Sequence, residues 1–136
     1  MNHVRIVLEE PKSSEEIHID SLSQIPNSVF DSIDVGDVLD FVVERDKAIM
    51  LIIQKLKHEG SIIIHGTDIL EVVRCGYIGL MDVAKLNEAL YGGRASSDAI
   101  NNIVNKLLGL GLTPVQKQIE NARYYVKATR NPPSDI

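Results

Sequence analysis

Acidic, imidazole and glycine residues stand at the ends of several predicted strands, where a sheet can present them to a ligand. His65 and Asp68 lie three positions apart and form an acid–base pair if they are within hydrogen-bond reach. Asp37 directly follows Gly36 after another apolar run, the position at which open α/β sheets bind ligands. Asp20 follows a third predicted strand. These five residues are the candidate ligand-binding residues of the chain.

Each of these residues also has an ordinary structural interpretation, which we favour from the residues alone. An aspartate after a strand readily accepts a hydrogen bond from its own downstream backbone, which accounts for Asp20. Asp37 fits a helix N-cap. A histidine at a strand end, such as His65, usually has a structural hydrogen-bond partner because buried polar groups are rarely left unpaired.

Other catalytic and metal-binding motifs are missing from the sequence. His18, His58 and His65 lack metal-ligand spacing, and the single cysteine, Cys75, makes a zinc site improbable. The chain contains neither a nucleophile-elbow serine motif nor a Walker phosphate-binding motif. We therefore expect no metal and no catalytic residue of these classes.

Composition indicates one globular domain. The chain has 136 residues, of which 44% are hydrophobic and 24% charged, as in ordinary soluble proteins. The net charge of −5 argues against nucleic acid as a partner, because phosphate contacts need clustered Lys and Arg. The N-terminus does not resemble a signal peptide, and no apolar run is long enough to span a membrane. With one cysteine, these features predict a cytoplasmic protein without a membrane partner.

Three strands are predicted in the N-terminal part, over residues 3–8, 16–20 and 29–35. The connection over residues 9–15 is shorter than the dozen residues that a parallel crossover generally needs. The first two strands are therefore expected either to form a hairpin or not to be neighbours.

Helices and strands alternate in the remainder of the chain. The predicted helix at 46–58 carries apolar residues at three- and four-residue spacing and ends at Gly60, and an apolar strand follows at 61–65. The further expectations are a helix at 82–91 ended by Gly92 and Gly93, a helix that starts at Ser96 or Ser97 and stops at Gly109 and Gly111, a β-hairpin at 113–130 around residues 120–122, and a flexible tail at 131–136.

This order of elements predicts the α/β class, with a partial Rossmann-like, mostly parallel sheet, helices on both faces and a C-terminal antiparallel hairpin. The segments IPNSVFDSIDVGDVLDFV (25–42) and KLKHEGSIIIHGTD (55–68) resemble the class I S-adenosylmethionine-dependent methyltransferases. LNEALYGG (86–93) and ARYYVKATRNPP (122–133) are similar to a methyltransferase-like group common among bacteriophages. The resemblance spans residues 16–133 and implies a methyltransferase-like fold.

The chain also departs from this family. It has no glycine before Gly36, so the family's glycine-rich cofactor loop after the first strand is missing. The family's acidic residue at the end of the second strand is missing too, and Phe41 stands where the family has a histidine. The resemblance therefore implies a single truncated methyltransferase-like domain over residues 1–136, with an atypical β-rich segment at 1–28.

Three functional interpretations follow. We favour a non-catalytic methyltransferase-like interaction module that needs no cofactor, and the resemblance to the bacteriophage group implies that a phage encodes it. Because a truncated sheet exposes an edge, we expect the module to form a homodimer or to bind another protein. The alternative is a methyltransferase that binds S-adenosylmethionine in an atypical pocket containing Asp20, Gly36, Asp37, His65 and Asp68. The third is a structural component of a virion or another assembly.

Overall fold

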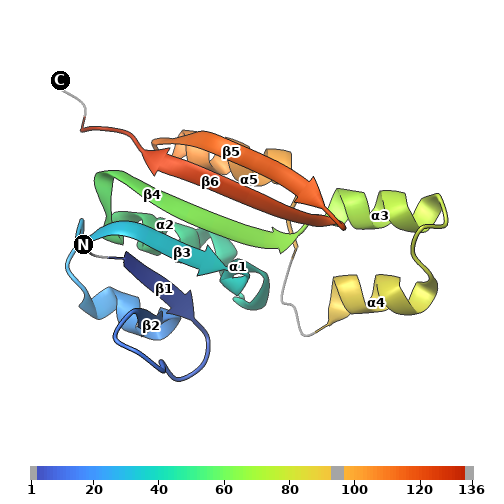
Figure 1. The fold of residues 1–136 in the computed structure, drawn as a ribbon, viewed down its shortest axis with the longest axis horizontal. Helices are drawn as coiled ribbons and strands as arrows, with labels where there is room; N and C mark the ends of the chain where they lie inside the picture. Colours follow the sequence, from blue (N-terminus) through green and yellow to red (C-terminus); the bar gives the residue numbers. More distant parts are fainter. Residues whose placement is uncertain (1–2, 93–96, 134–136) are drawn as a thin grey trace.

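A six-stranded sheet forms the centre of the computed structural model, which describes residues 3–92 and 97–133 (Figure 1). The strand order is β2-β1-β3-β4-β6-β5; β1 to β4 are parallel, and β6 runs antiparallel to both of its neighbours. The strands are β1 (His3–Val7), β2 (Glu16–His18), β3 (Phe30–Gly36), β4 (Leu56–Thr67), β5 (Leu112–Glu120) and β6 (Arg123–Arg130). The expected fold class, a mostly parallel sheet with a C-terminal antiparallel hairpin, is confirmed.

Helices lie around this sheet. In Figure 1, α2 and α5 lie behind the strands, whereas α3 and α4 lie beyond the end of β4. The helical segments are η1 (Ile19–Gln24), α1 (Val38–Phe41), α2 (Arg45–Lys55), α3 (Ile69–Tyr77), α4 (Val83–Tyr91) and α5 (Ile100–Gly109). Each described helix is too short or too polar to cross a lipid bilayer.

The hydrophobic core lies between the sheet and the helices α2 and α5. Ile62 and Ile64 of β4 and Val126 of β6 are fully buried there, together with Ile52 of α2 and Leu107 of α5. Since successive side chains of a strand point to opposite faces, the residues between them lie on the other face of the sheet. That face is only partly shielded from solvent along β4 and β6.

The pairing of the first two strands differs from the expectation. β1 and β2 are neighbours and parallel, with Arg5 opposite Glu16 and Val7 opposite His18, so the prediction of a hairpin or of no contact is wrong. The paired stretch of β2 is three residues, so the connection needs to run back only about 10 Å. Residues 8–15 cover that distance without a crossover helix.

Several helix boundaries also differ. α2 ends at Lys55 rather than at residue 58, because Leu56 already pairs with Phe30 as the first residue of β4. The helices α1 and α3 were not predicted. α4 begins at Val83, one residue after the predicted start. Ser97 is described but lies before α5, which begins at Ile100; the proposed cap Ser96, the terminator Gly93 and residues 134–136 of the tail lie outside the described residues.

Candidate functional site

A cleft of about 480 Å³ opens at the carboxyl ends of β1 and β3. We call it the switch-point cleft, because the chain leaves β1 toward β2 on one side while β3 lies on the other side. Connections that diverge in this way leave a crevice in which open α/β sheets bind ligands. It is lined by residues 5–10 and 34–38 together with Lys12, Glu16, Phe41 and His65.

Local backbone chemistry shapes the wall of the cleft that β3 supplies. Gly36 has a φ of +57°, a conformation that glycine adopts at little cost. The Asp34 carboxylate accepts a hydrogen bond of 3.0 Å from the Gly36 N–H, as aspartates do in tight turns. The strand therefore turns sharply here, and Asp37 follows at the mouth of the cleft, immediately before α1.

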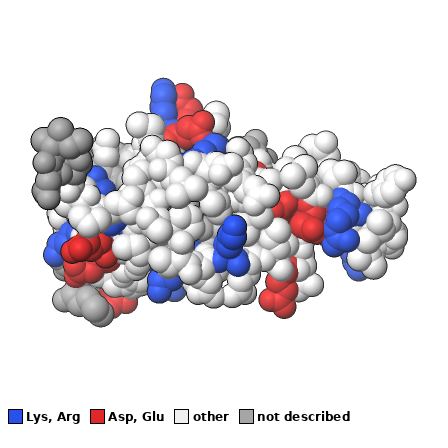
Figure 2. All heavy atoms as spheres, turned by 90° about the horizontal axis from the view of Figure 1, so that it is seen from above, with Lys and Arg blue, Asp and Glu red and all other residues white. Residues whose placement is uncertain are grey.

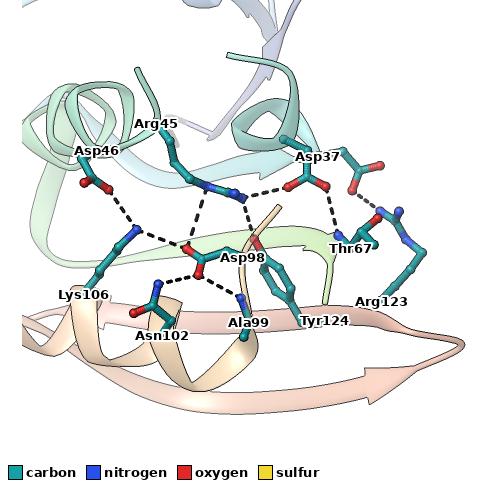
Figure 3. A network of polar contacts seen from close by, with 11 residues as sticks. Asp37, Arg45, Asp46, Thr67, Asp98, Ala99, Asn102, Lys106, Arg123 and Tyr124 are labelled. Carbon is teal, nitrogen blue, oxygen red and sulfur yellow. Dashed lines mark hydrogen bonds and ion pairs between the residues drawn. The ribbon is translucent and has the colours of Figure 1, made fainter. Parts of the chain in front are cut away.

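Carboxylates outnumber cations in the lining of the switch-point cleft. The acidic side chains are Glu9, Glu10, Glu16, Asp34 and Asp37, and the basic ones are Arg5 and Lys12. Arg5 lies 3.7 Å from Asp34, and Asp37 pairs with Arg123 of β6 (Figure 3). The cleft therefore suits a ligand that carries positive charge or hydroxyl groups rather than one that carries phosphates.

His65 connects this cleft to a neighbouring groove. It lies near the end of β4 and lines both the switch-point cleft and a groove of about 340 Å³ beside β5 and β6. Its ring packs edge-on against Tyr125, with 5.0 Å between the ring centroids. Gln116, Gln118 and Glu120 contribute polar groups to the groove. A group bound in either hollow can thus lie near the imidazole.

A second polar cluster is buried behind the sheet, where α2, α5 and β6 meet (Figure 3). Arg45 donates from Nη2 to Asp40 Oδ1 at 2.8 Å and to the Tyr124 hydroxyl at 3.2 Å. Asp40 also accepts the Thr67 N–H at 3.0 Å. Burial raises the pKa of Tyr124, which keeps its hydroxyl protonated at neutral pH. Within the described residues, Arg45 Nε forms no hydrogen bond and lies 4.0 Å from Asp98 Oδ2, so the guanidinium also takes part in an ion pair with Asp98.

Asp98 and Lys106 extend the same cluster. Burial on its own would raise the pKa of Asp98, but hydrogen bonds from Asn102, the Ala99 N–H and Lys106 outweigh it and lower the pKa. Burial would lower the pKa of Lys106, but its bonds to Asp46 and Asp98 outweigh this and raise it. Both groups are therefore held in their charged forms. We call this cluster, with Asp40, Arg45 and Tyr124, the buried network.

The structure brings three of the five candidate residues together. Gly36, Asp37 and His65 line the switch-point cleft. Asp20 lies in η1 outside this lining, with its side chain 88% exposed. Asp68 is buried and accepts hydrogen bonds from the Glu71 N–H and the Ile100 N–H, so it holds the starts of α3 and α5.

Sequence reasoning missed two parts of the site. The first is the loop after β1, in which Leu8, Glu9 and Glu10 form one wall of the cleft. The second is Arg123 of β6, which reaches Asp37 past the end of the intervening strand β4. Leu8, Glu9 and Glu10 are consecutive and directly follow an apolar strand, which is a local signal for the loop. Arg123 is 86 residues from Asp37, so no local pattern joins these two residues.

Comparison with known proteins identifies the fold. No family model and no curated protein sequence matches the chain. A SAM-dependent methyltransferase from Thermotoga maritima matches with a TM-score of 0.65 and 14% identity over 96% of this chain and 82% of its own. An S-adenosylmethionine-dependent methyltransferase from Mesorhizobium loti matches with a TM-score of 0.64 and 14% identity over 95% of this chain and 81% of its own.

A larger protein shares the same fold. An O-methyltransferase family protein from Burkholderia thailandensis matches with a TM-score of 0.60 and 12% identity over 85% of this chain, but this chain spans only 35% of its length. The chain therefore has a methyltransferase-like, Rossmann-like fold. The matched structures from Thermotoga maritima and Mesorhizobium loti are named as S-adenosylmethionine-dependent methyltransferases, and this finding contradicts the expectation that no cofactor is involved.

Proposed function

We propose that this methyltransferase-like protein binds S-adenosylmethionine in the switch-point cleft. One observation carries the proposal: the cleft lies where the chain diverges between β1 and β3, the place at which sheets of this kind bind ligands. Solved methyltransferases of the same fold support the choice of ligand.

The residues of the cleft fit this ligand. Its volume of about 480 Å³ lies within the usual range for small-molecule sites. Val7, Leu8 and Phe41 offer apolar contact for an adenine ring. Asp34 and Asp37 offer carboxylates for ribose hydroxyls, for the amino group or for the positively charged sulfur. The same carboxylates disfavour a dinucleotide, whose phosphates they would repel.

S-Adenosylmethionine supplies an electrophilic methyl group when bound. The residues of this chain would orient the ligand and hold or move a proton of the acceptor. His65 suits the second task, because it lines both the cleft and the groove beside β5 and β6. A neutral imidazole there can take a proton from an acceptor that occupies the groove.

Calorimetric titration with S-adenosylmethionine and S-adenosylhomocysteine tests the proposal. We expect micromolar binding to the unmodified protein. Asp37→Asn should weaken it about tenfold by removing a charge-assisted contact, and Leu8→Trp should block it by filling the cleft. Asp20→Asn is the matched control, because it makes the same chemical change outside the lining and should leave the affinity unchanged.

The absence of heat at millimolar ligand, from protein with a normal circular dichroism spectrum, would contradict the proposal. So would equal weakening by Asp20→Asn and Asp37→Asn, since the ligand would then bind elsewhere. Retained affinity in Leu8→Trp would exclude this cleft as the site.

A second candidate is a non-catalytic interaction module, as the departures in the sequence suggest. Its support is that β1 leads through residues 8–15 directly to β2, and this segment contains no glycine and starts no helix. This segment therefore lacks the glycine-rich turn and helix start whose backbone N–H groups would bind a ligand. This candidate predicts that the folded protein transfers no methyl group when S-adenosylmethionine is present, so a methyl-transfer assay separates the two.

A further inference from the structure

We propose that the helical hairpin of α3 and α4 is the interface through which two copies of this chain form a two-fold dimer. Figure 1 shows the two helices side by side beyond the end of β4, away from the strands. The surface concerned, called here the α3–α4 apolar face, consists of Leu70, Val73 and Tyr77 of α3 with Val83 and Tyr91 of α4. The proposal does not depend on S-adenosylmethionine binding.

The α3–α4 apolar face is strongly exposed. Tyr77 is 91% exposed, Tyr91 75% and Val83 73%, and Leu70 and Val73 are exposed by more than half. Ile78 and Leu80 in the turn between the helices are exposed as well. Single exposed apolar residues are common, but a continuous group of this kind marks an interaction surface.

Helix geometry places these side chains on one side of the hairpin. Residues 70, 73 and 77 follow the i, i+3, i+7 spacing of one helix face. The two helices pack through Gly76, where an added Cβ would clash with Leu86. Around each helix axis, the exposed apolar residues lie on one side of the Gly76–Leu86 contact. Because the helices are antiparallel, this is the same side of the hairpin for both helices.

The opposite flank of the hairpin faces the rest of the protein. Lys85, Glu88 and Ala89 of α4 line a hollow between α4 and the turn that joins β5 to β6. Asn121 and Arg123 line the other side of this hollow. On this flank Lys85 and Glu88 of α4 lie beside the buried Val72 of α3, whereas the exposed apolar side chains of α4 face outward. This is the reverse of the pattern for a surface helix that packs on its own core.

The hairpin also needs a covering surface for its stability. Val72 is the one buried side chain of α3, and α4 has none within Val83–Tyr91. Helices of nine residues are marginal in water unless an apolar face is packed. Asp68 and Asp82 cap the two helices, but caps satisfy backbone groups and do not bury the exposed side chains.

Area and charge favour a second copy as the occupant. The five side chains expose on the order of 700 Å², close to the roughly 800 Å² that one partner gives to a standard interface. None of them is charged, and the neighbouring Arg74 is paired with Glu71 at 2.8 Å, so two identical faces can meet without repulsion. Figure 2 shows acidic and basic side chains next to each other at the end of the molecule where α3 lies.

An anionic membrane surface fits the α3–α4 apolar face less well than a second copy of the chain. Lipid-binding helices carry Lys and Arg around their apolar face, and the net charge of −5 opposes such binding. Two hairpins related by a two-fold axis would instead bring four helices together, with the a/d-type spacing of α3 at the seam. The copies then bury each other's Tyr77 and Tyr91, and aromatic residues are enriched at such interfaces.

Sedimentation equilibrium of the full chain across micromolar concentrations tests the proposal, with Val73→Glu and Val115→Glu as a matched pair. Both valines are 57% exposed, but Val115 lies on the edge strand β5. We expect a dimer for the unmodified protein and for Val115→Glu. Val73→Glu should weaken it about a hundredfold, because symmetry buries the new carboxylate twice. Tyr77→Ser, which adds no charge, should weaken it less.

Circular dichroism and thermal unfolding of each variant show whether it is folded. A monomeric unmodified protein overturns the proposal, and if this monomer sediments with vesicles of phosphatidylcholine and phosphatidylglycerol, the face binds lipid instead. A dimer that survives both Val73→Glu and Tyr77→Ser also overturns it. Loss of the dimer in Val115→Glu alone would assign the interface to the edge of the sheet.

Discussion

The buried network and the switch-point cleft are both rich in charged side chains, but these side chains differ in solvent exposure and in the distance to their ion-pair partners. In the network, Asp40 is fully buried and Arg45 is 9% exposed, and they are joined at 2.8 Å. In the cleft, Arg5 and Asp34 are 60% and 25% exposed and lie 3.7 Å apart. A charge removed from water needs close partners, whereas a charge in an open cleft is hydrated until a ligand arrives.

This difference separates structural from ligand-binding residues. Through hydrogen bonds and ion pairs inside the protein, the network joins α2 to β6 and to α5. The cleft presents carboxylates whose ion-pair partners are exposed to solvent. Substitutions in the network should therefore change the free energy of unfolding, and substitutions in the cleft should change ligand affinity.

Arg45→Met should give the largest effect. Removing the guanidinium leaves buried carboxylates without its charge, which typically costs about 3–5 kcal/mol of unfolding free energy. Arg5→Met is the matched control in the cleft and should change stability by less than about 1 kcal/mol, because its ion pair is exposed. Urea denaturation measures both, and equal losses would remove the distinction between the two regions.

Asp68→Ala should destabilise the protein by about 2 kcal/mol, since it removes caps from two helices at about 1 kcal/mol each. Its carboxylate accepts hydrogen bonds from the first turns of both α3 and α5. Asp20→Ala serves as the exposed control and should lie within about 0.5 kcal/mol of the unmodified protein. A similar small effect for Asp68→Ala would show that these caps contribute little.

The pH dependence of stability sharpens the comparison further. The pKa of Asp98 is lowered in the folded protein, so its contribution is present above the ordinary value of 3.8 and is lost as the pH falls through the folded pKa. The pKa of Lys106 is raised, so its contribution is lost as the pH rises above 10.5 through the folded pKa. Asp98→Asn should flatten the acid limb in thermal unfolding; an unchanged acid limb would contradict this assignment.

Asp37→Asn should have the smallest effect on stability. The Asp37–Arg123 pair has side chains 42% and 39% exposed, so its loss should change the unfolding free energy by less than about 1 kcal/mol. The same substitution is expected to weaken S-adenosylmethionine binding. Chemical denaturation beside calorimetry measures both, and a large loss of stability would place Asp37 with the buried network.

Elements specified by nearby residues were predictable from sequence. A helix was predicted over residues 82–91, and α4 forms there, with its cap supplied by the adjacent Asp82, whose side chain accepts the Lys85 N–H. The hairpin turns at Asn121 and Ala122, both with positive φ, as two-residue hairpin loops require. Such signals act over a few residues, so a single sequence contains them.

Elements specified by distant residues were not predictable. The first N–H of α5 is capped by Asp68, 32 residues earlier, so the search for a serine cap near the helix placed its start too early. β4 begins at Leu56 because Phe30 pairs with it, although its early residues resemble a helix end. The parallel pairing of β1 and β2 depended on how short β2 is, which the apolar pattern overestimated.

By itself, the sequence determined the α/β class, the C-terminal hairpin and the candidates Gly36, Asp37 and His65, because hydrophobic period and turn residues are local properties. The tertiary structure alone decided which of the acidic residues share a cleft, that Asp68 is a structural cap and that α3 and α4 turn their apolar side chains outward. Those outcomes depend on the order in which strands pair and on which helix faces find the core. Both are set by contacts between residues far apart in the chain.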